Sequence, residues 1–488
     1  MSETDRRTRP AAAAGPGGAL GGRKWLGLAI VSLAQLMVML DVTVMSVALP
    51  SVQHGIGLTD ADRQWVITAY TLAFGGLLLF GGNLADRLGR KRTFLIGVIG
   101  FAAASAVGGA AQFPAMIIGA RAVQGAFAAV LSPSLMSLIA TMFTQQRERT
   151  KAIGIASAIA LGGTALGLPI GGLLTTYLDW RWCLYINLPI AVVAAVGALL
   201  VLPDLAGKQD TRFDLVGTVL ACVGMVALTY GLSSAAEYGW GSGQVLVSMA
   251  VAVVGLAAFV LVERRVAHPM LPMRILTERN RAGAFLGMGL SRVGMFGVLL
   301  FLTYYLQEVM HYSALLTGFA AIPLVIANGV AATSLVQKLT PIVPPRWLVS
   351  PGLLLSAGAV FLFTFLTPDS SYVLGILPAE IILGIGLGLT NSPAMNTALS
   401  GTTPRDAGVT AATVSASGQI GASLGTALFN TIATMATASF IAASVTKTAD
   451  VVQAGTVHGY VVASAWGAGI LVAAAVLCAL LINAAPKR

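Results

Sequence analysis

Long apolar runs separated by short polar segments make up most of the chain. A helix needs about 20 mostly apolar residues to cross the hydrocarbon core of a bilayer. Such runs predict about fourteen transmembrane helices, at 25–49, 64–83, 93–111, 114–141, 152–177, 183–202, 215–234, 244–262, 282–307, 317–337, 347–366, 372–393, 408–433 and 460–484. Two longer polar segments, 263–281 and 434–459, are predicted as loops. The pattern therefore predicts an all-α membrane protein.

The composition supports this interpretation and excludes two others. Hydrophobic residues make up 56% of the 488 positions and charged residues only 10%, whereas soluble proteins carry about a quarter charged residues. So few charges cannot cover a water-exposed surface, which excludes a soluble globular protein. The apolar content also excludes disorder over most of the length.

The basic residues test the predicted spans independently. With both termini placed in the cytoplasm, 24 of the 29 Lys and Arg residues fall in cytoplasmic segments, and three fall in outer loops. This asymmetry is what the positive-inside rule predicts. Topology thus explains the net charge of +10 and removes the main support for a nucleic-acid partner.

The order of the spans indicates two similar halves. We expect a disordered cytoplasmic tail at 1–22, which lacks the apolar stretch of a signal peptide. A six-helix half at 23–202 would be followed by two inserted helices at 203–262 and the cytoplasmic connection at 263–281. A second six-helix half at 282–488 would complete the chain. Two such halves commonly hold a substrate between them near the midplane of the membrane.

One predicted cytoplasmic loop carries a motif with a distinctive spacing. The segment GNLADRLGRKR begins at Gly82. Its two glycines would permit a tight turn, and its Asp can accept charge-assisted hydrogen bonds, so the cluster can latch the two halves together in one conformation. The residues concerned are Gly82, Asp86, Arg87, Gly89 and Arg90. The segment resembles the loop signature of the major facilitator superfamily, which implies two six-helix halves around a central cavity.

Further segments are similar to one branch of that superfamily, the fourteen-span drug:proton antiporters. Matching segments run from about residue 30 to 430 and include Leu40–Pro50, Gln64–Tyr70, Trp180–Pro189, Phe213–Gly217 and Tyr304–Gln307. The resemblance implies an exporter of amphiphilic drugs or antibiotics in the cytoplasmic membrane of a bacterium. Its energy source would be the proton gradient, with no cofactor.

The fifth predicted span is glycine-rich and resembles the antiporter motif of this branch. Small residues four positions apart let helices approach closely, and a proline removes a backbone hydrogen bond and favours a kink. Helix packing alone would also explain these glycines. The motif residues are Gly163, Gly167, Pro169, Gly171 and Gly172.

Four ionisable residues lie inside predicted spans: Asp41, Arg121, Arg292 and Glu380. A charge at the centre of a bilayer costs at least about 2.5–3.5 kcal/mol, so each is a candidate functional residue. They fall in the first and fourth spans of each half. The resemblance implies that these four helices line the central cavity.

Asp41 and Arg121 are predicted to lie at similar depths, about 12 and 10 Å from the outer surface at 1.5 Å per residue. Arg121 and Gln124 belong to a segment similar to the RxxQG motif of the superfamily. A carboxyl group beside an arginine has a lowered pKa, and burial raises that pKa once the arginine turns away. We therefore expect Asp41 to carry protons and Arg121 to modulate it. A static structural ion pair is the alternative.

Arg292 and Glu380 have several open interpretations. They could pair with each other, or Glu380 could attract a cationic substrate and Arg292 an anionic one. Other polar residues in the spans could line the cavity or form interhelical hydrogen bonds with equal probability. These are Gln35, Tyr70, Asn187, Gln307, Asn328, Asn391 and Gln419.

Other classes of function find little support in the residues. The three cysteines lie in apolar runs without zinc-ligand spacing, so we expect no metal site. The chain has no GxxxxGK[ST] segment for a nucleotide, and its four scattered histidines suggest no catalytic group. A proton-coupled importer and a polytopic membrane enzyme remain the alternatives to a proton-coupled exporter.

Overall fold

A computed structural model describes residues 23–58, 60–204, 214–266, 269, 271–402, 406–444 and 448–484. All regular secondary structure in these ranges is helical, which confirms the predicted all-α class. The predicted tail at 1–22 and most of the 203–214 connection lie outside the described residues.

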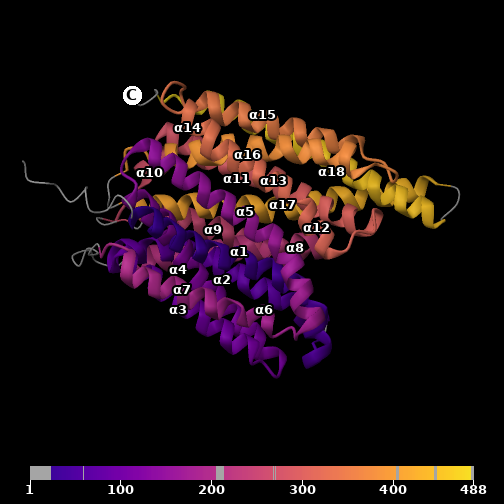
Figure 1. The fold of residues 1–488 in the computed structure, drawn as a ribbon, viewed down its shortest axis with the longest axis horizontal. Coiled ribbons are helices and arrows are strands. Elements are labelled where there is room, and N and C mark those ends of the chain that lie inside the picture. Colours follow the sequence, from indigo (N-terminus) through magenta and orange to yellow (C-terminus); the bar gives the residue numbers. More distant parts are fainter. Residues whose placement is uncertain are drawn as a thin grey trace, which may run out of the picture.

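The first helices form a bundle at the lower side of Figure 1, coloured indigo to magenta. They are α1 (Arg23–Ile56), α2 (Asp60–Leu88), α3 (Arg90–Gly109), α4 (Pro114–Met142), α5 (Gln146–Tyr177), α6 (Trp182–Tyr185) and α7 (Asn187–Val201). We call this set the N-terminal bundle.

The last helices form a second bundle, coloured pink to yellow. They are α11 (Arg279–Tyr304), η1 (Tyr305–Val309), α12 (Ala314–Ala320), α13 (Ile322–Val330), η2 (Ala331–Leu335), α14 (Val336–Leu339), α15 (Arg346–Leu362), η3 (Phe363–Phe365), η4 (Tyr372–Ile376), α16 (Leu377–Leu399), α17 (Ala407–Ala443) and α18 (Ala449–Leu481). We call this set the C-terminal bundle.

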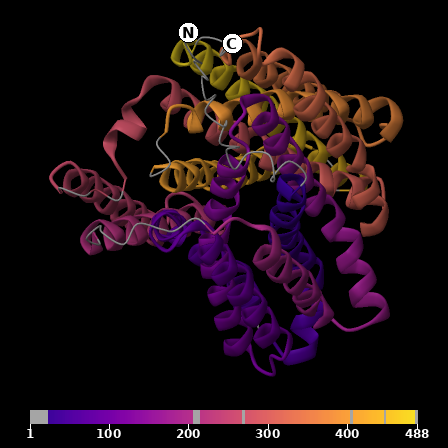
Figure 2. The same cartoon turned by 60° about the vertical axis from the view of Figure 1, so that its left-hand side comes forward.

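Two helices between the bundles form a hairpin, α8 (Leu215–Tyr238) and α9 (Gly243–Glu263). The hairpin projects at the side of the molecule, as Figure 2 shows. Helix α8 packs against both α2 and α17, so it covers one of the two seams between the bundles. A short helix, α10 (Met273–Thr277), follows in the 263–281 connection.

Twelve helical segments in the described part of the chain are long and apolar enough to cross a membrane. Two further predicted spans coincide with α8, whose apolar stretch Val216–Leu232 is shorter, and with α11. The arrangement is compatible with fourteen spans, and that count stays a prediction. Apolar side chains such as Leu200, Val254 and Leu480 lie exposed on the outside, as lipid-facing residues would.

The ends of the helices meet at one face of the molecule, which we call the basic end. The starts of α1 and α5 are joined there by an ion pair between Lys24 and Glu148 at 2.7 Å. The end of α18 lies beside the start of α11, because the Asn483 amide donates to Asn280 Oδ1 at 2.7 Å. Figure 1 shows this end on the left. The described parts of the predicted cytoplasmic segments near Glu148, Asn280 and α14 lie at this face.

Two loop predictions are wrong in part. The 84–92 connection is mostly helix, since α2 runs to Leu88 and α3 begins at Arg90. The turn is Gly89 alone, which has φ of +88°, a conformation open to glycine. The polar segment 434–459 is also mostly helical, because α17 extends to Ala443 and α18 starts at Ala449. Its many alanines favour helix over loop.

Candidate functional site

The side chain of Asp41 lies at the centre of the N-terminal bundle, on α1, and is only 1% exposed. Its Oδ2 accepts a hydrogen bond from Arg121 Nη1 on α4 at 2.6 Å. Its Oδ1 accepts from Gln124 Nε2 at 2.8 Å and from Asn187 Nδ2 on α7 at 2.7 Å. Three donors from two helices thus surround a buried carboxylate, which offsets the cost of removing its charge from water.

The side chain of Arg121, like that of Asp41, is buried and fixed by several contacts. It is 2% exposed and lies with its guanidinium carbon 4.4 Å from the ring centre of Tyr70 on α2. Its Nη1 also donates to Gln124 Oε1 at 2.5 Å, and its Nε donates to the Val66 carbonyl at 3.4 Å. The aromatic face and the hydrogen bonds stabilise the cation in place.

A third group, Ser105 on α3, connects the amides of this cluster. Its Oγ accepts from Gln124 Nε2 at 2.7 Å and from Asn187 Nδ2 at 3.3 Å. Sequence analysis did not predict a role for Ser105, since a serine inside an apolar run gives no distinct signal. Asn187 appeared there only as a weaker candidate, although the segment Tyr185–Pro189 that contains it was noted.

We call Asp41, Ser105, Arg121, Gln124 and Asn187 the Asp41 cluster. Its members come from α1, α3, α4 and α7 and make their contacts inside one bundle. Loss of the negative charge on Asp41 would leave Arg121 as an uncompensated buried cation, which is costly. The cluster can therefore link protonation of one carboxyl group to the arrangement of four helices.

The second predicted acid, Glu380, lies in the first turn of α16 and is fully buried. Tyr372 Oη lies 3.1 Å from its Oε2, and its Oε1 has no hydrogen-bond partner. Arg292 on α11 lies beside Gly418 and Gly421 of α17. Among the described residues no ion pair joins Arg292 to Glu380, so the pairing considered from the sequence is not formed in this structure.

The remaining cavity candidates divide between buried and partly buried positions. Gln35, Tyr70 and Asn328 are buried, at 7%, 3% and 2% exposed. Tyr70 Oη and Asn328 Oδ1 are buried without a hydrogen-bond partner. Gln307 and Asn391 are partly buried. The structure brings only Tyr70 of this group to the Asp41 cluster.

The predicted antiporter motif on α5 has two faces. Its glycines pack on α1, where a Cβ on Gly163 would lie 3.0 Å from Leu36 Cδ1 and one on Gly171 would lie 3.1 Å from the Val44 carbonyl. A Cβ on Gly167 would collide with Thr43, whereas Gly172 faces open space. Pro169 packs on Gly318 of α12, in the other bundle. The motif therefore lies between Asp41's helix and the C-terminal bundle.

The predicted latch segment also contacts the C-terminal bundle, but through helix packing. Gly82 lies inside α2, where a Cβ would collide with Ala412 of α17, so it makes no turn. Arg90 is buried and donates from Nη1 to Thr141 Oγ1 on α4 at 2.9 Å. Arg87 lies in the last turn of α2. The side chain of Asp86 lies outside the described residues.

Hydrogen bonds between the bundles gather at the basic end, where the start of α5 meets the end of α16. Asn396 Oδ1 accepts from Arg149 Nε at 3.1 Å, and Asn396 Nδ2 donates to Thr150 Oγ1 at 3.0 Å. Ser392 Oγ donates to the Thr150 carbonyl at 3.1 Å. We call these four residues the clasp. The clasp could not be predicted from the sequence, because the partners of Arg149 and Thr150 are neutral residues about 246 positions away, which carry no pairing signal.

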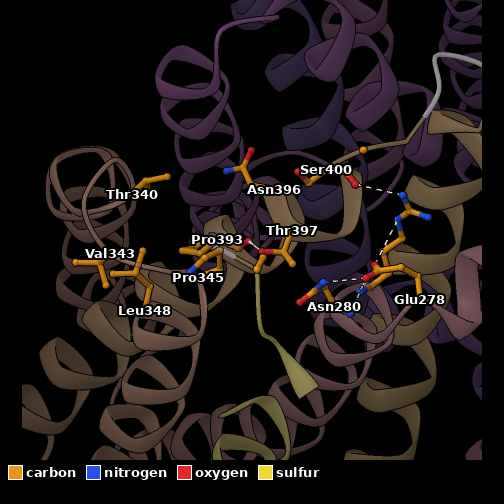
Figure 3. A pocket seen from close by; sticks show the side chains of 13 residues that line it. Glu278, Asn280, Thr340, Val343, Pro345, Leu348, Pro393, Asn396, Thr397 and Ser400 are labelled. Atoms are coloured by element: carbon orange, nitrogen blue, oxygen red, sulfur yellow. Dashed lines mark hydrogen bonds and ion pairs between the residues drawn. The ribbon is translucent and has the colours of Figure 1, made fainter. Parts of the chain in front are cut away.

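A small pocket adjoins the clasp at the basic end of the C-terminal bundle (Figure 3). Its volume is about 190 Å³, and Asn396, Thr397 and Ser400 of the α16 region line one side of it.

Comparison with known proteins identifies the family. The sequence matches the Major Facilitator Superfamily over residues 31–426, and the chain belongs to this superfamily of membrane transporters. The human organic anion transporter MFSD10 (TETRAN) has the same fold, with a TM-score of 0.64 over 93% of this chain and 99% of that one. Its sequence identity is only 14%.

Several relatives are much more similar in sequence. The puromycin resistance protein pur8 of Streptomyces alboniger is 48% identical over 94% of this chain and 92% of its own. The cephamycin export protein CmcT of Amycolatopsis lactamdurans is 39% identical over 83% of this chain and 84% of its own. The multidrug efflux pump LfrA of Mycolicibacterium smegmatis is 30% identical over 84% of this chain and 81% of its own.

Proposed function

We propose that this protein exports amphiphilic antibiotics or drugs across the cytoplasmic membrane of a bacterium, in exchange for protons. Relatives named for puromycin resistance, cephamycin export and multidrug efflux support the direction and the substrate class. The observation that carries the proton coupling is the burial of Asp41 against Arg121, at 2.6 Å, inside a membrane-embedded bundle.

Transport would proceed by alternating access between the two bundles. The halves at 23–202 and 282–488 would rock about the α5 and α2 seams, with the basic end in the cytoplasm. In the conformation described here the clasp closes that end. A drug would enter from the cytoplasm after the clasp opens and leave from the opposite end.

Asp41 would supply the coupling through its charge. While it is ionised it holds Arg121, Gln124 and Asn187 together. A proton on Asp41 would remove the attraction to Arg121 and release the side chain from these donors. Helices α1, α4 and α7 would then be free to adopt the arrangement of the other conformation. The antiporter motif on α5 packs directly on α1 and would pass this change to the seam.

The test is accumulation of radiolabelled puromycin in inside-out membrane vesicles, with and without an imposed proton gradient. Accumulation in such vesicles reports export, so an importer would not give it. We expect Asp41→Asn to lose the gradient-driven component while the protein still inserts and folds. The matched control is Asp179→Asn, because Asp179 is an exposed acid paired with Arg181 in a loop. Normal gradient-driven accumulation by Asp41→Asn would refute the assignment.

A further inference from the structure

Glu380 is a buried acid within the C-terminal bundle that has no part in the mechanism proposed for Asp41. It is 0% exposed, and its Oε1 has no hydrogen-bond partner. Its Oε2 has a single neighbour of hydrogen-bonding distance, Tyr372 Oη at 3.1 Å. An ionised Glu380 would be stabilised by one hydrogen bond at most, whereas the carboxylate of Asp41 accepts hydrogen bonds from three donors.

The number of hydrogens limits which group can donate in this contact. Tyr372 Oη also lies 2.7 Å from the carbonyl oxygen of Ala320. A phenol has one hydrogen, and a carbonyl can only accept. If Tyr372 donates to Ala320, the shorter of its two contacts, then the bond to Glu380 exists only when the carboxyl group is protonated and donates to Tyr372 Oη. The relay Glu380–Tyr372–Ala320 is complete in the protonated form alone.

No counter-charge stands near this acid among the described residues. Helices α13, η2 and α17, which pack on α16, carry no charged residue. The charged residues of α5, α14 and α15, and Arg279 and Arg281 at the start of α11, lie at the basic end. Arg292 on α11 makes no ion pair with Glu380 among the described residues. The ring centre of Tyr312, a further titratable group, lies 6.3 Å from that of Tyr372. Burial without a partner therefore favours the neutral acid.

The far end of the relay lies at a break in a membrane helix. Ala320 ends α12, and α13 begins at Ile322, with Pro323 at its start. Two residues before Ala320, Gly318 packs on Pro169 of the antiporter motif, with the Ala165 carbonyl 3.1 Å from where its Cβ would be. The segment that Tyr372 holds is thus the segment that closes the seam with α5.

We propose that Glu380 is a second proton-binding site, and that its proton holds the seam between α12 and α5 in the conformation described here. When the proton leaves to water, the carboxylate draws the single hydrogen of Tyr372, and Ala320 loses its donor. The backbone at the break between α12 and α13 can then adopt another conformation, and Gly318 moves relative to Pro169. This inference rests on the proposed proton coupling but assigns a different residue, in the other bundle.

The test follows the seam directly and needs no substrate. Spin labels at exposed Tyr177 of α5 and Leu316 of α12 would report their separation by pulsed electron resonance in lipid nanodiscs, titrated from acidic to alkaline pH. We expect the wild-type distance distribution to change on alkalinisation. Asp41 also acts on this seam through the contact of α5 with α1, so Glu380→Gln is measured in an Asp41→Asn background. There the distribution should stay in the acidic form at every pH, because the Gln amide donates to Tyr372 as the protonated acid does.

Two further variants test the role of Tyr372 and separate the effect of Glu380 from that of Asp41. Tyr372→Phe should lose the pH response by staying in the alkaline distribution, since the relay to Ala320 is cut. Asp41→Asn should keep the response, so a failure of the Asp41 assignment is distinguishable from a failure of this one. A pH response in the double variant Asp41→Asn/Glu380→Gln, or no response in the wild type, would overturn the proposal.

Discussion

Asn396 bridges the two bundles through both ends of its amide, accepting from Arg149 at 3.1 Å and donating to Thr150 at 3.0 Å. We predict that Asn396→Ala shifts the protein toward the conformation that is open at the basic end. Each lost hydrogen bond is worth about 0.5–1.5 kcal/mol, so the ratio of conformations should change by roughly five- to hundredfold. Spin labels at exposed Gln145 and Ile342 would measure the separation of the bundles there.

The matched control is Thr397→Ala. Thr397 neighbours Asn396 on α16, but its hydroxyl donates only to the Pro393 carbonyl of the same helix among the described contacts. This variant should keep the wild-type distance distribution. Equal shifts in both variants would mean that α16 itself was disturbed, and the clasp would lose its role.

Asn187 is predicted to support the ionised form of Asp41. Asn187→Ala removes a donor 2.7 Å from Asp41 Oδ1, and a hydrogen bond to a charged group is worth about 1.5–3 kcal/mol. We expect a lower melting temperature in detergent and reduced gradient-driven puromycin accumulation. Ser105→Ala should lower accumulation less, because Ser105 contacts the two amides rather than Asp41. A larger loss of accumulation in Ser105→Ala than in Asn187→Ala would show that the contacts of Ser105 matter more.

Two glycines of the antiporter motif should differ sharply on substitution. A Cβ at Gly167 collides with Thr43 and lies 3.2 Å from the Leu40 carbonyl, whereas Gly172 has no neighbour within 4 Å. Gly167→Ala should therefore cost about 1–3 kcal/mol by overpacking and force α5 away from α1. Gly172→Ala should be tolerated. Melting temperature and puromycin accumulation measured side by side would separate the two, and equal tolerance would contradict the packing described here.

Glu278 gives a pH-dependent prediction outside the membrane. Partial burial raises its pKa, but hydrogen bonds from the Asn280 and Arg281 amides outweigh this, so the pKa is lowered below its ordinary value. A lowered pKa means that the stabilising contribution is present above the ordinary value and is lost as the pH falls through the folded-state pKa.

Glu278→Gln should therefore lower the melting temperature at neutral pH, by loosening the N-terminal cap of α11. The difference from the wild type should shrink as the medium becomes more acidic than about pH 4.5, the ordinary range of a glutamate. A difference that grows on acidification would show that another group controls the stability of this end.

Part of this site could be predicted from the sequence, because a charged residue inside an apolar span is easily recognised. Asp41 and Arg121 are ionisable residues inside predicted spans at similar predicted depths, and they lie in contact. Ser105, Ser392 and Asn396 could not be singled out, because neutral polar residues in apolar helices carry no such mark, and Arg149 lies in a predicted cytoplasmic loop among other basic residues. The break between α12 and α13 also went unpredicted, since Pro323 lies in an otherwise continuous apolar run. The contact between Tyr372 and Ala320 could not be predicted, because Tyr372 contacts the backbone carbonyl of Ala320 and this does not depend on the identity of that residue.

The α8–α9 hairpin has a mechanical consequence. Helix α8 touches α2 at two adjacent glycines, Gly75 beside Thr229 and Gly76 beside Val226. It also packs on α17, and the turn that follows α8 is joined to α17 by a hydrogen bond from Trp240 Nε1 to Thr431 Oγ1. Any change in tilt between the bundles must therefore make α8 slide along either α2 or α17. Val226 and Thr229 fill the space beside these glycines, and Trp65 of α2 stacks on Tyr230 of α8. Sliding should therefore occur along α17, and the hairpin should travel with the N-terminal bundle.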